Sequence, residues 1–170
     1  MEIVLASCVL RQWRLSDVDS LVQNANNRKI WANVRDRFPS PYTRADAQNW
    51  VNHASTEYPV INFAISVDGK AVGGIGLIPG QDIEKKSAEI GYWLGEDFWG
   101  RGIVSDAVKG FTNYAFANFE FCRLWATVFA KNIGSQRVLE KAGYVREGVL
   151  HKGAYKNGQI LDTILYAITV

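Results

Sequence analysis

The segment between residues 87 and 118 constrains the fold most, because a strand pattern, a glycine-rich turn and an amphipathic helix follow one another there. Ser87 to Leu94 predicts a strand, Gly95 to Gly102 is rich in glycine and aromatic residues, and Ile103 to Asn118 has helical spacing of apolar residues. Cys122 to Phe129 is a mostly apolar strand. Two strands joined through a helix need a crossover connection, which requires parallel neighbours somewhere in the sheet.

The elements before and after this segment give a mixed order of strands and helices. Asn157-Gly158 predicts a two-residue hairpin between the last two strands. Ser16 and Thr43 have side-chain oxygens suited to cap helices, and Gly143 predicts the end of the last one. The other expected strands cover residues 7–14, 61–67, 71–78, 144–150 and 160–169, and the other expected helices begin at residues 16, 43 and 132. We expect one mixed α/β domain over residues 1–170.

Composition excludes several classes of protein. A chain of 170 residues that is 48% hydrophobic can bury a core without disulfides. The net charge is +2 and no basic run is longer than Lys85-Lys86, which argues against direct nucleic-acid binding. Cys8 and Cys122 lie far apart, and Cys122 is expected to be a small buried hydrophobe rather than a nucleophile. His53 and His151 lack partners at metal-ligand spacing, so no metal site is expected.

The N-terminal residues resemble a lipoprotein signal only superficially. Residues 3–10 are apolar, and Leu5 to Cys8 looks like a bacterial lipoprotein cleavage box. Only Met1 and the acidic Glu2 precede them, whereas a signal peptide begins with a basic region. No stretch reaches the ~18–20 apolar residues of a membrane span. We therefore expect a cytoplasmic protein with no membrane partner.

The turn Trp99-Gly100-Arg101-Gly102-Ile103-Val104-Ser105-Asp106 lies directly between a predicted strand and a predicted helix. A helix N-terminus holds unpaired N–H groups and the positive end of the helix dipole, and glycines let a phosphate approach the backbone. The turn therefore predicts a pyrophosphate site with Arg101 available for charge, and the alternative is a turn that is only structural. A dinucleotide-binding fingerprint is rejected, because several elements precede the turn and no acidic residue ends the next strand.

Short motifs follow one another along essentially the whole chain. They are Val9-Leu10-Arg11, Phe38-Pro39-x-Pro41-Tyr42-Thr43, Ala88-Glu89-Ile90-Gly91-Tyr92-Trp93-Leu94, Trp99-Gly100-x-Gly102, Asn132-x-x-Ser135, Glu140-Lys141-x-Gly143-Tyr144 and Gly158 to Tyr166. In this order and spacing the sequence resembles the GCN5-related N-acetyltransferases (GNAT), in the RimJ/RimL-type branch of ribosomal-protein N-terminal acetyltransferases.

This resemblance implies a fold and a cosubstrate. The fold is a mixed, mostly antiparallel sheet of six to seven strands flanked by about four helices, with a splay between the fourth and fifth strands. Acetyl-CoA would bind in the splay near Trp93 and Leu94. Its phosphates would lie on the loop formed by Gly100, Arg101, Gly102, Ile103, Val104 and Ser105, and Asn132 would also contact it. Two positions of this loop depart from the family's pattern. Trp99 stands where the family has Gln or Arg, and Val104 stands where it has a small residue.

The resemblance also implies catalytic residues for acetyl transfer to an amine. Glu89 lies on the strand beside the acceptor cleft and is our candidate general base, although it also fits an exposed strand carboxylate. The family's usual tyrosine acid is replaced by Leu139. Ser135 matches a serine proposed for this role in the RimL branch, although it also fits a first-turn helix serine. A backbone N–H near Tyr92 or Trp93 would hold the oxyanion.

The acceptor side is less specific. Trp31, Phe38, Tyr42 and Trp50 fall in or beside the first two helices, and each also fits simple packing. Asp162 is a weak further candidate. The acceptor would be a protein N-terminus or a small-molecule amine, and the protein a monomer or homodimer. The alternative from another class is a non-catalytic acyl-CoA-binding sensor or docking module on the same fold.

Overall fold

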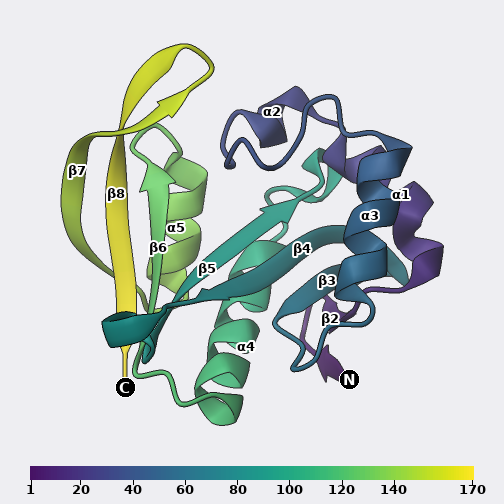
Figure 1. Ribbon diagram of the computed structural model, residues 1–170, viewed down its shortest axis with the longest axis horizontal. Helices are drawn as coiled ribbons and strands as arrows, with labels where there is room; N and C mark the ends of the chain where they lie inside the picture. Colours follow the sequence, from purple (N-terminus) through teal and green to yellow (C-terminus); the bar gives the residue numbers. More distant parts are fainter.

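The chain folds around one eight-stranded sheet, and the computed structural model describes residues 1–170 (Figure 1). The strand order is β1-β2-β3-β4-β5-β6-β8-β7, and all neighbouring strands are antiparallel except β5 and β6. The strands are β1 (Glu2–Val4), β2 (Val9–Gln12), β3 (Asn62–Val67), β4 (Lys70–Pro79), β5 (Ser87–Leu94), β6 (Arg123–Phe129), β7 (Val145–Lys156) and β8 (Gln159–Thr169).

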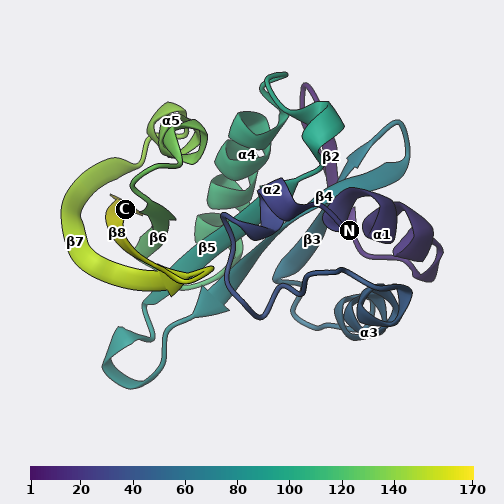
Figure 2. The ribbon, with the colours of Figure 1, turned by 90° about the horizontal axis from the view of Figure 1, so that it is seen from above.

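Helices cover both faces of the sheet (Figure 2). α1 and α3 contribute to the core on one face, and α4 and α5 contribute to the core on the other. The helices are α1 (Val18–Ala25), α2 (Arg28–Trp31), α3 (Arg44–Ala54), α4 (Ile103–Asn118) and α5 (Ile133–Lys141), with short 3₁₀ helices at Leu15–Asp17, Asp82–Glu84 and Glu96–Phe98. No helix combines the length and the apolar composition that a membrane span requires.

The parallel strands β5 and β6 pair over only three residues each. The first pair is Ser87 with Arg123, and the last pair is Glu89 with Trp125. β5 continues to Leu94 and β6 to Phe129, and the two strands diverge over this distance (Figure 1). β6 remains paired with β8 along its whole length, and β5 remains paired with β4 up to Leu94. The sheet is therefore continuous at one end of this pair and open at the other.

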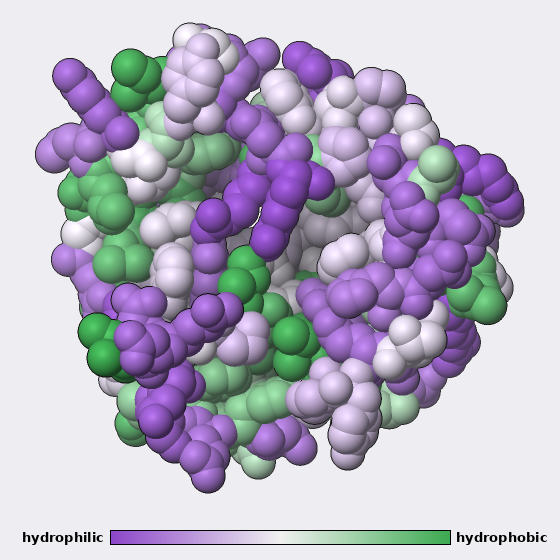
Figure 3. All heavy atoms as spheres, in the orientation of Figure 1, coloured by the Kyte–Doolittle hydropathy of each residue, from purple (hydrophilic) through white to green (hydrophobic).

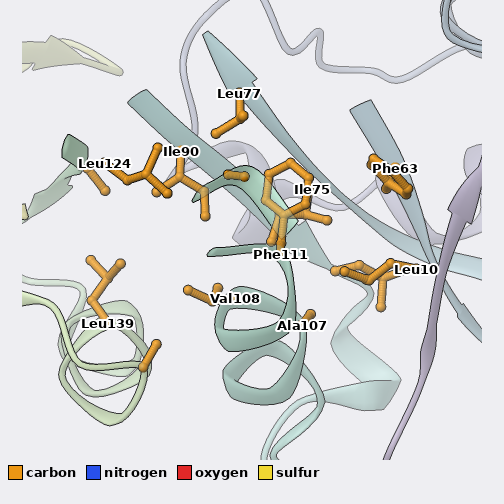
Figure 4. Packing of buried hydrophobic residues seen from close by; sticks show 14 of the residues in the cluster. Leu10, Phe63, Ile75, Leu77, Ile90, Ala107, Val108, Phe111, Leu124 and Leu139 are labelled. Atoms are coloured by element: carbon orange, nitrogen blue, oxygen red, sulfur yellow. The ribbon is translucent and has the colours of Figure 1, made fainter. Parts of the chain in front are cut away.

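The larger core lies between the sheet and α4 and α5 (Figure 4). Phe111 of α4 lies 5.6 Å from the ring of Phe63 on β3, and it stacks with Tyr114 at 5.9 Å. Leu139 of α5 is fully buried and belongs to the same cluster as Leu124 of β6. These contacts fix α4 and α5 against the open pair of strands from one side.

The second core lies on the opposite face, beneath α1 and α3. Its largest buried side chains include Trp13, Leu21 and Val51. The start of α1 is held by Asp17, which receives two hydrogen bonds of 2.8 Å from Arg11 and one of 2.8 Å from the backbone N–H of Arg14. Ser16 was the expected helix cap, and this expectation was wrong, because Ser16 lies inside the 3₁₀ turn Leu15–Asp17 that precedes α1, and the N–H of Arg14 donates to Asp17 at the start of that turn.

The expected mixed fold is confirmed, with one strand and one helix more than the sequence predicted. The extra strand is β1, which pairs with β2, and the extra helix is the single turn α2, capped by Asn27. Asn157 and Gly158 join β7 to β8 as expected, but β7 extends to Lys156 rather than ending near residue 150. The thiol of Cys122 is exposed and not buried, because β6 begins one residue later.

Candidate active site

A cavity of about 430 Å³ opens on the side where β5 leaves β6. In the space-filling view, the surface is hollowed near the centre of this face, between hydrophilic and hydrophobic residues (Figure 3). Four parts of the chain form its wall, namely α2 and the residues after it, the end of β5, the N-terminus of α4, and α5. The lining residues are Lys29, Ile30, Asn33, Val34, Tyr92, Trp93, Leu94, Phe98, Trp99, Gly100, Gly102, Ile103, Val104, Ser105, Asn132, Gly134, Ser135, Arg137, Val138 and Lys141.

The N-terminus of α4 provides unpaired backbone N–H groups at this cavity. Gly100 and Gly102 have φ angles of +73° and +77°, which favour glycine, and an added Cβ at either residue would extend into open space. Gly102 caps α4 without a side chain, and the first helical bond runs from the N–H of Asp106 to the carbonyl of Gly102. The N–H groups of residues 103–105 thus remain available for an anion at the positive end of the helix dipole.

The positive charge at the cavity comes from residues other than Arg101. The guanidinium of Arg101 donates to the carbonyl of Asp97 at 2.6 Å and lies over the ring of Phe98 at 5.3 Å, outside the cavity wall. Arg137 and Lys141 line the cavity from successive turns of α5, and neither forms an ion pair. The sequence interpretation missed this pair, although the spacing of four residues on a helix could have indicated it.

The backbone of β5 offers hydrogen-bonding groups toward the gap. In an antiparallel ladder, alternate residues bond to the neighbouring strand. Gly95 donates to Val72, and Gly80 donates to Ser87, so the odd-numbered residues of β5 bond to β4. The N–H and C=O groups of Tyr92 and Leu94 therefore face the side that β6 has left. The carbonyl of Leu94 accepts the indole N–H of Trp99 at 2.8 Å, which gives Trp99 a structural role at the turn.

The same alternation places the side chains of β5 on two faces. Ala88, Ile90 and Leu94 are buried in the core beneath α4. Glu89 and Trp93 are on the opposite face, with Gly91 between them. An added Cβ at Gly91 would meet no atom within 4 Å, so this face of the strand is open at that point.

Ser135 and Tyr92 form a hydroxyl pair at the cavity. The Tyr92 hydroxyl lies 2.8 Å from the Oγ of Ser135 and 3.4 Å from its carbonyl oxygen. Asn132 accepts a hydrogen bond of 3.2 Å from the N–H of Ser135 and so caps α5. Burial raises the pKa of the Tyr92 phenol well above its usual value, which keeps the phenol protonated. The sequence interpretation named the backbone of Tyr92 and missed its hydroxyl group.

The carboxylate of Glu89 is not part of the cavity wall, which includes Tyr92, Trp93 and Leu94 of the same strand. Its side chain is 13% exposed and forms an ion pair with Arg35, which follows α2. The Arg35 side chain is itself 58% exposed. Glu89 is therefore partly open to solvent on the face of β5 that carries Trp93, and a cation covers it.

The aromatic acceptor-side candidates Phe38, Tyr42 and Trp50 pack in or against the second core. Phe38 packs against Trp93 with 5.5 Å between ring centroids and against Tyr42 at 5.0 Å, next to the open face of β5. Tyr42 is buried, and this burial raises the pKa of its phenol to about 12. Trp50 packs edge-on against Trp13 at 6.3 Å. None of these aromatic residues except Trp93 lines the cavity.

Trp31 and Asp162 have partners within the protein. The Trp31 ring is contacted by the Arg28 guanidinium at 4.1 Å and by the Lys156 ammonium at 3.9 Å. The carboxylate of Asp162 accepts a hydrogen bond of 2.8 Å from the N–H of Lys152 and lies 3.1 Å from the Nδ1 atom of His151. These two hydrogen bonds, that from Lys152 first, lower the pKa of the Asp162 carboxyl. Both side chains lie outside the cavity wall.

The fold and the cavity together define a class of protein. A mixed sheet whose parallel pair opens beside a glycine-capped helix N-terminus is the arrangement that the resemblance to the acyl-CoA-dependent acyltransferases of the GNAT family implies. A model of the Acetyltransferase (GNAT) domain matches residues 8–145, and the chain belongs to this family. It is an acetyltransferase, and enzymes of this family take the acetyl group from acetyl-CoA.

Proteins that are similar to this chain over nearly its whole length agree with this assignment. The uncharacterized N-acetyltransferase p20 of Bacillus licheniformis is 28% identical over 165 residues, which are 94% of this chain and 90% of that protein. The structure of RimL, a ribosomal L7/L12 alpha-N-protein acetyltransferase in complex with coenzyme A, has a TM-score of 0.86 at 22% identity and covers 100% of this chain and 98% of its own. The microcin C7 self-immunity acetyltransferase MccE, in complex with acetyl-CoA and AMP, has a TM-score of 0.80 at 23% identity over 97% and 93% of the two chains.

Proposed function

We propose that this acetyltransferase transfers the acetyl group of acetyl-CoA directly to a primary amine, within a complex that holds both substrates. The observation that carries the proposal is the composition of one cavity. It joins the free N–H groups at the start of α4, the open backbone edge of β5 and the Ser135–Tyr92 pair. The cavity thus offers an anion site for the phosphates of acetyl-CoA, a strand edge for its extended pantetheine arm and hydroxyl donors for its sulfur.

Residues of the cavity would contact the phosphates and the pantetheine arm of acetyl-CoA. The N–H groups of residues 103–105 would hold the pyrophosphate, and Arg137 and Lys141 would hold further phosphate charge. The open N–H and C=O groups of Tyr92 and the N–H of Leu94 would bond to the amide groups of the pantetheine arm, since the Leu94 carbonyl already accepts from Trp99. Acetyl-CoA supplies an activated acyl group, and the protein's own groups do the remaining work.

The chemistry needs a base on the acceptor side and donors on the cofactor side. A protonated amine is not nucleophilic, and Glu89 is the carboxylate on the open face of β5 that could accept its proton. The N–H of Tyr92 points into the gap, where it could donate to the oxygen of the acetyl group as negative charge develops there. Ser135 would donate to the sulfur.

Two acceptor classes are consistent with the open face of β5. The similarity to RimL supports a protein α-amine, and the similarity to MccE supports a small molecule. Gly91 and the rim formed by Phe38 and Trp93 leave the face open without selecting either class.

The experiment that tests the proposal measures release of coenzyme A with a thiol reagent. Acetyl-CoA is mixed with short peptides bearing a free N-terminus, with polyamines or with amino acids, and products are identified by mass spectrometry. Amine-dependent thiol release with an equal amount of acetylated amine is expected. Binding of acetyl-CoA without release by any amine would overturn the transfer to amines.

A thermal-unfolding titration tests the binding step separately. Ligand at 100 times Kd stabilises a fold by about 2.7 kcal/mol, which corresponds to a rise in Tm of roughly 5–11 °C for a domain of this size. Acetyl-CoA should raise Tm, and adenosine, which lacks phosphates and pantetheine, should not. No rise at millimolar acetyl-CoA would contradict the assignment of the cavity.

A further inference from the structure

We propose that the hydroxyl group of Tyr92 positions the hydroxyl of Ser135, so that the two act as one donor unit for the sulfur that leaves the acetyl group. The proposal rests on the function proposed above. It is carried by the contact between Tyr92 on β5 and Ser135 on α5, which joins the open end of β5 to a helix on one face of the sheet. Both residues line the cavity.

The hydrogen bonds at Ser135 leave its own proton free. The Tyr92 oxygen lies 2.8 Å from Oγ and 3.4 Å from the carbonyl oxygen of Ser135, so both acceptors near the phenol proton belong to this one residue. Ser135 Oγ has no other hydrogen-bond partner in the protein, and its N–H is held by Asn132. If Tyr92 donates to Oγ, the serine proton has no protein acceptor and can turn to a group in the cavity.

The phenol is suited to donate rather than to ionise. Burial raises the pKa of the Tyr92 phenol and outweighs the opposing effect of the hydrogen bond with Ser135, while Tyr144 and Tyr166 add to the rise. The residue therefore remains a neutral donor over the pH range in which an amine reacts. A fixed neutral donor costs no reorganisation when charge develops beside it.

Leu139 shows why a substitute for the family's tyrosine is needed. Its side chain is fully buried in the core together with Leu124, and it presents no polar group to the cavity (Figure 4). It lies on α5 one turn after Ser135. The cavity wall carries three hydroxyl side chains, of which Ser105 lies at the start of α4, whereas those of Ser135 and Tyr92 lie within hydrogen-bond distance of each other.

The step balances without a change in the charge of Tyr92. The carbon–sulfur bond breaks, its electron pair stays on the sulfur, and the carbon–nitrogen bond of the amide has formed. Ser135 donates a hydrogen bond to the sulfur, and Tyr92 donates one to Oγ of Ser135. Both hydroxyls keep their protons, coenzyme A takes a proton from water as it leaves, and the proton of the amine goes to Glu89 and then to solvent.

A double-mutant cycle of Tyr92→Phe and Ser135→Ala tests this coupling. Phenylalanine keeps the ring and removes only the hydroxyl. Each single variant should lower kcat by about 10- to 100-fold, the effect of a hydrogen bond to a charged group, with the KM for acetyl-CoA within twofold of wild type. Because Tyr92 acts through Ser135, the double variant should lose no more than Ser135→Ala alone.

A matched control is Tyr114→Phe, which removes the hydroxyl that donates to the Val60 carbonyl at 3.0 Å, toward the other end of α4. It should leave kcat unchanged. Additive losses in the double variant would assign Tyr92 a role independent of Ser135 and overturn the proposal. Full kcat in Ser135→Ala would also overturn it, whether or not Tyr92→Phe folds.

The same assay separates this proposal from the proposed function. Amine-dependent release of coenzyme A by wild type, with equal kcat in Tyr92→Phe, overturns only the role of Tyr92. No release by wild type overturns the proposed function and, with it, the inference that rests on it.

Discussion

Glu89 and Arg35 form an ion pair in which the carboxylate is 13% exposed and the guanidinium side chain 58% exposed. The pair joins β5 to the segment after α2, 54 residues apart in sequence. The proposed general base is therefore already paired with a cation in the absence of an amine. An incoming ammonium group carries the same charge as the guanidinium, so the two compete for one carboxylate.

The first prediction concerns Glu89→Gln. Removal of the base should lower kcat by about 100-fold at a pH well below the pKa of the acceptor, which is about 7.7–8.0 for an α-amine. The loss should shrink above that pH, because the amine then arrives deprotonated. The measurement is kcat against pH with a saturating peptide amine.

A matched control is Glu147→Gln, since Glu147 is also paired with an arginine, Arg123, at 2.8 Å but lies on β7. That variant should keep the wild-type profile. If Glu89→Gln reduces kcat by the same factor at every pH, or not at all, Glu89 is not the base.

The second prediction concerns Arg35→Ala. Removal of the competing cation should lower the KM for the amine by about two- to fivefold, the range expected for a largely exposed ion pair, with kcat unchanged. Arg44→Ala breaks an exposed pair with Asp19 elsewhere and should change neither constant. A fall in kcat for Arg35→Ala would indicate instead that Arg35 holds Glu89 in its working position.

Local patterns explain which parts of the fold could be predicted. β5 and α4 have the bounds that the sequence indicated, because apolar spacing and a glycine turn act over a few residues. Thr43 caps α3 in a capping box, because its hydroxyl oxygen accepts from the N–H of Asp46 and the Asp46 carboxylate accepts from the N–H of Thr43. The short β1 and α2 carry too few residues to produce a period, and so they were missed.

The side-chain pairing at the site depends on contacts that no local pattern encodes. Tyr92 and Ser135 are 43 residues apart, and Lys156 reaches Asp36 across 120 residues. Trp31 was a candidate for the acceptor because of its place in the chain, yet the structure places Lys156 and Arg28 on its ring. Such contacts depend on how segments far apart in the sequence pack against one another, which a local pattern does not specify.

The third prediction concerns the cations of α5. Arg137→Ala and Lys141→Ala should each raise the KM for acetyl-CoA about three- to tenfold, and the effect should weaken as salt is added. Lys109→Ala, on the exposed side of α4, should have no effect. Repeating the series with 3′-dephospho-acetyl-CoA identifies the phosphate involved, because a residue that binds the 3′-phosphate loses its effect there. Unchanged KM in both variants would place the phosphates elsewhere.

The fourth prediction compares two glycines with similar backbone angles. Gly102 and Gly158 have φ angles of +77° and +75°, and neither has an atom within 4 Å of an added Cβ. Alanine at either position should destabilise the fold by about 1–2 kcal/mol. Only Gly102→Ala places a methyl group at the start of α4, so it alone should raise the KM for acetyl-CoA, by about tenfold or more. Equal KM values for the two variants would contradict an anion site at this turn.

The last prediction concerns stability and the buried pair of Arg11 and Asp17, whose side chains are only 4% and 6% exposed. Arg11→Met leaves the Asp17 carboxylate buried without its partner, which should cost about 3–5 kcal/mol and lower Tm by roughly 6–20 °C. Replacing Arg11 by Met and Asp17 by Leu together removes the unpaired charge and should recover more than half of the lost stability, because the double variant then lacks only the hydrogen bond from the N–H of Arg14 to Asp17.

The control is Arg44→Ala, which breaks the exposed pair with Asp19 and should cost less than about 1 kcal/mol. Equal losses in Arg11→Met and Arg44→Ala, measured by thermal unfolding, would mean that the Asp17 carboxylate finds water when Arg11 is removed.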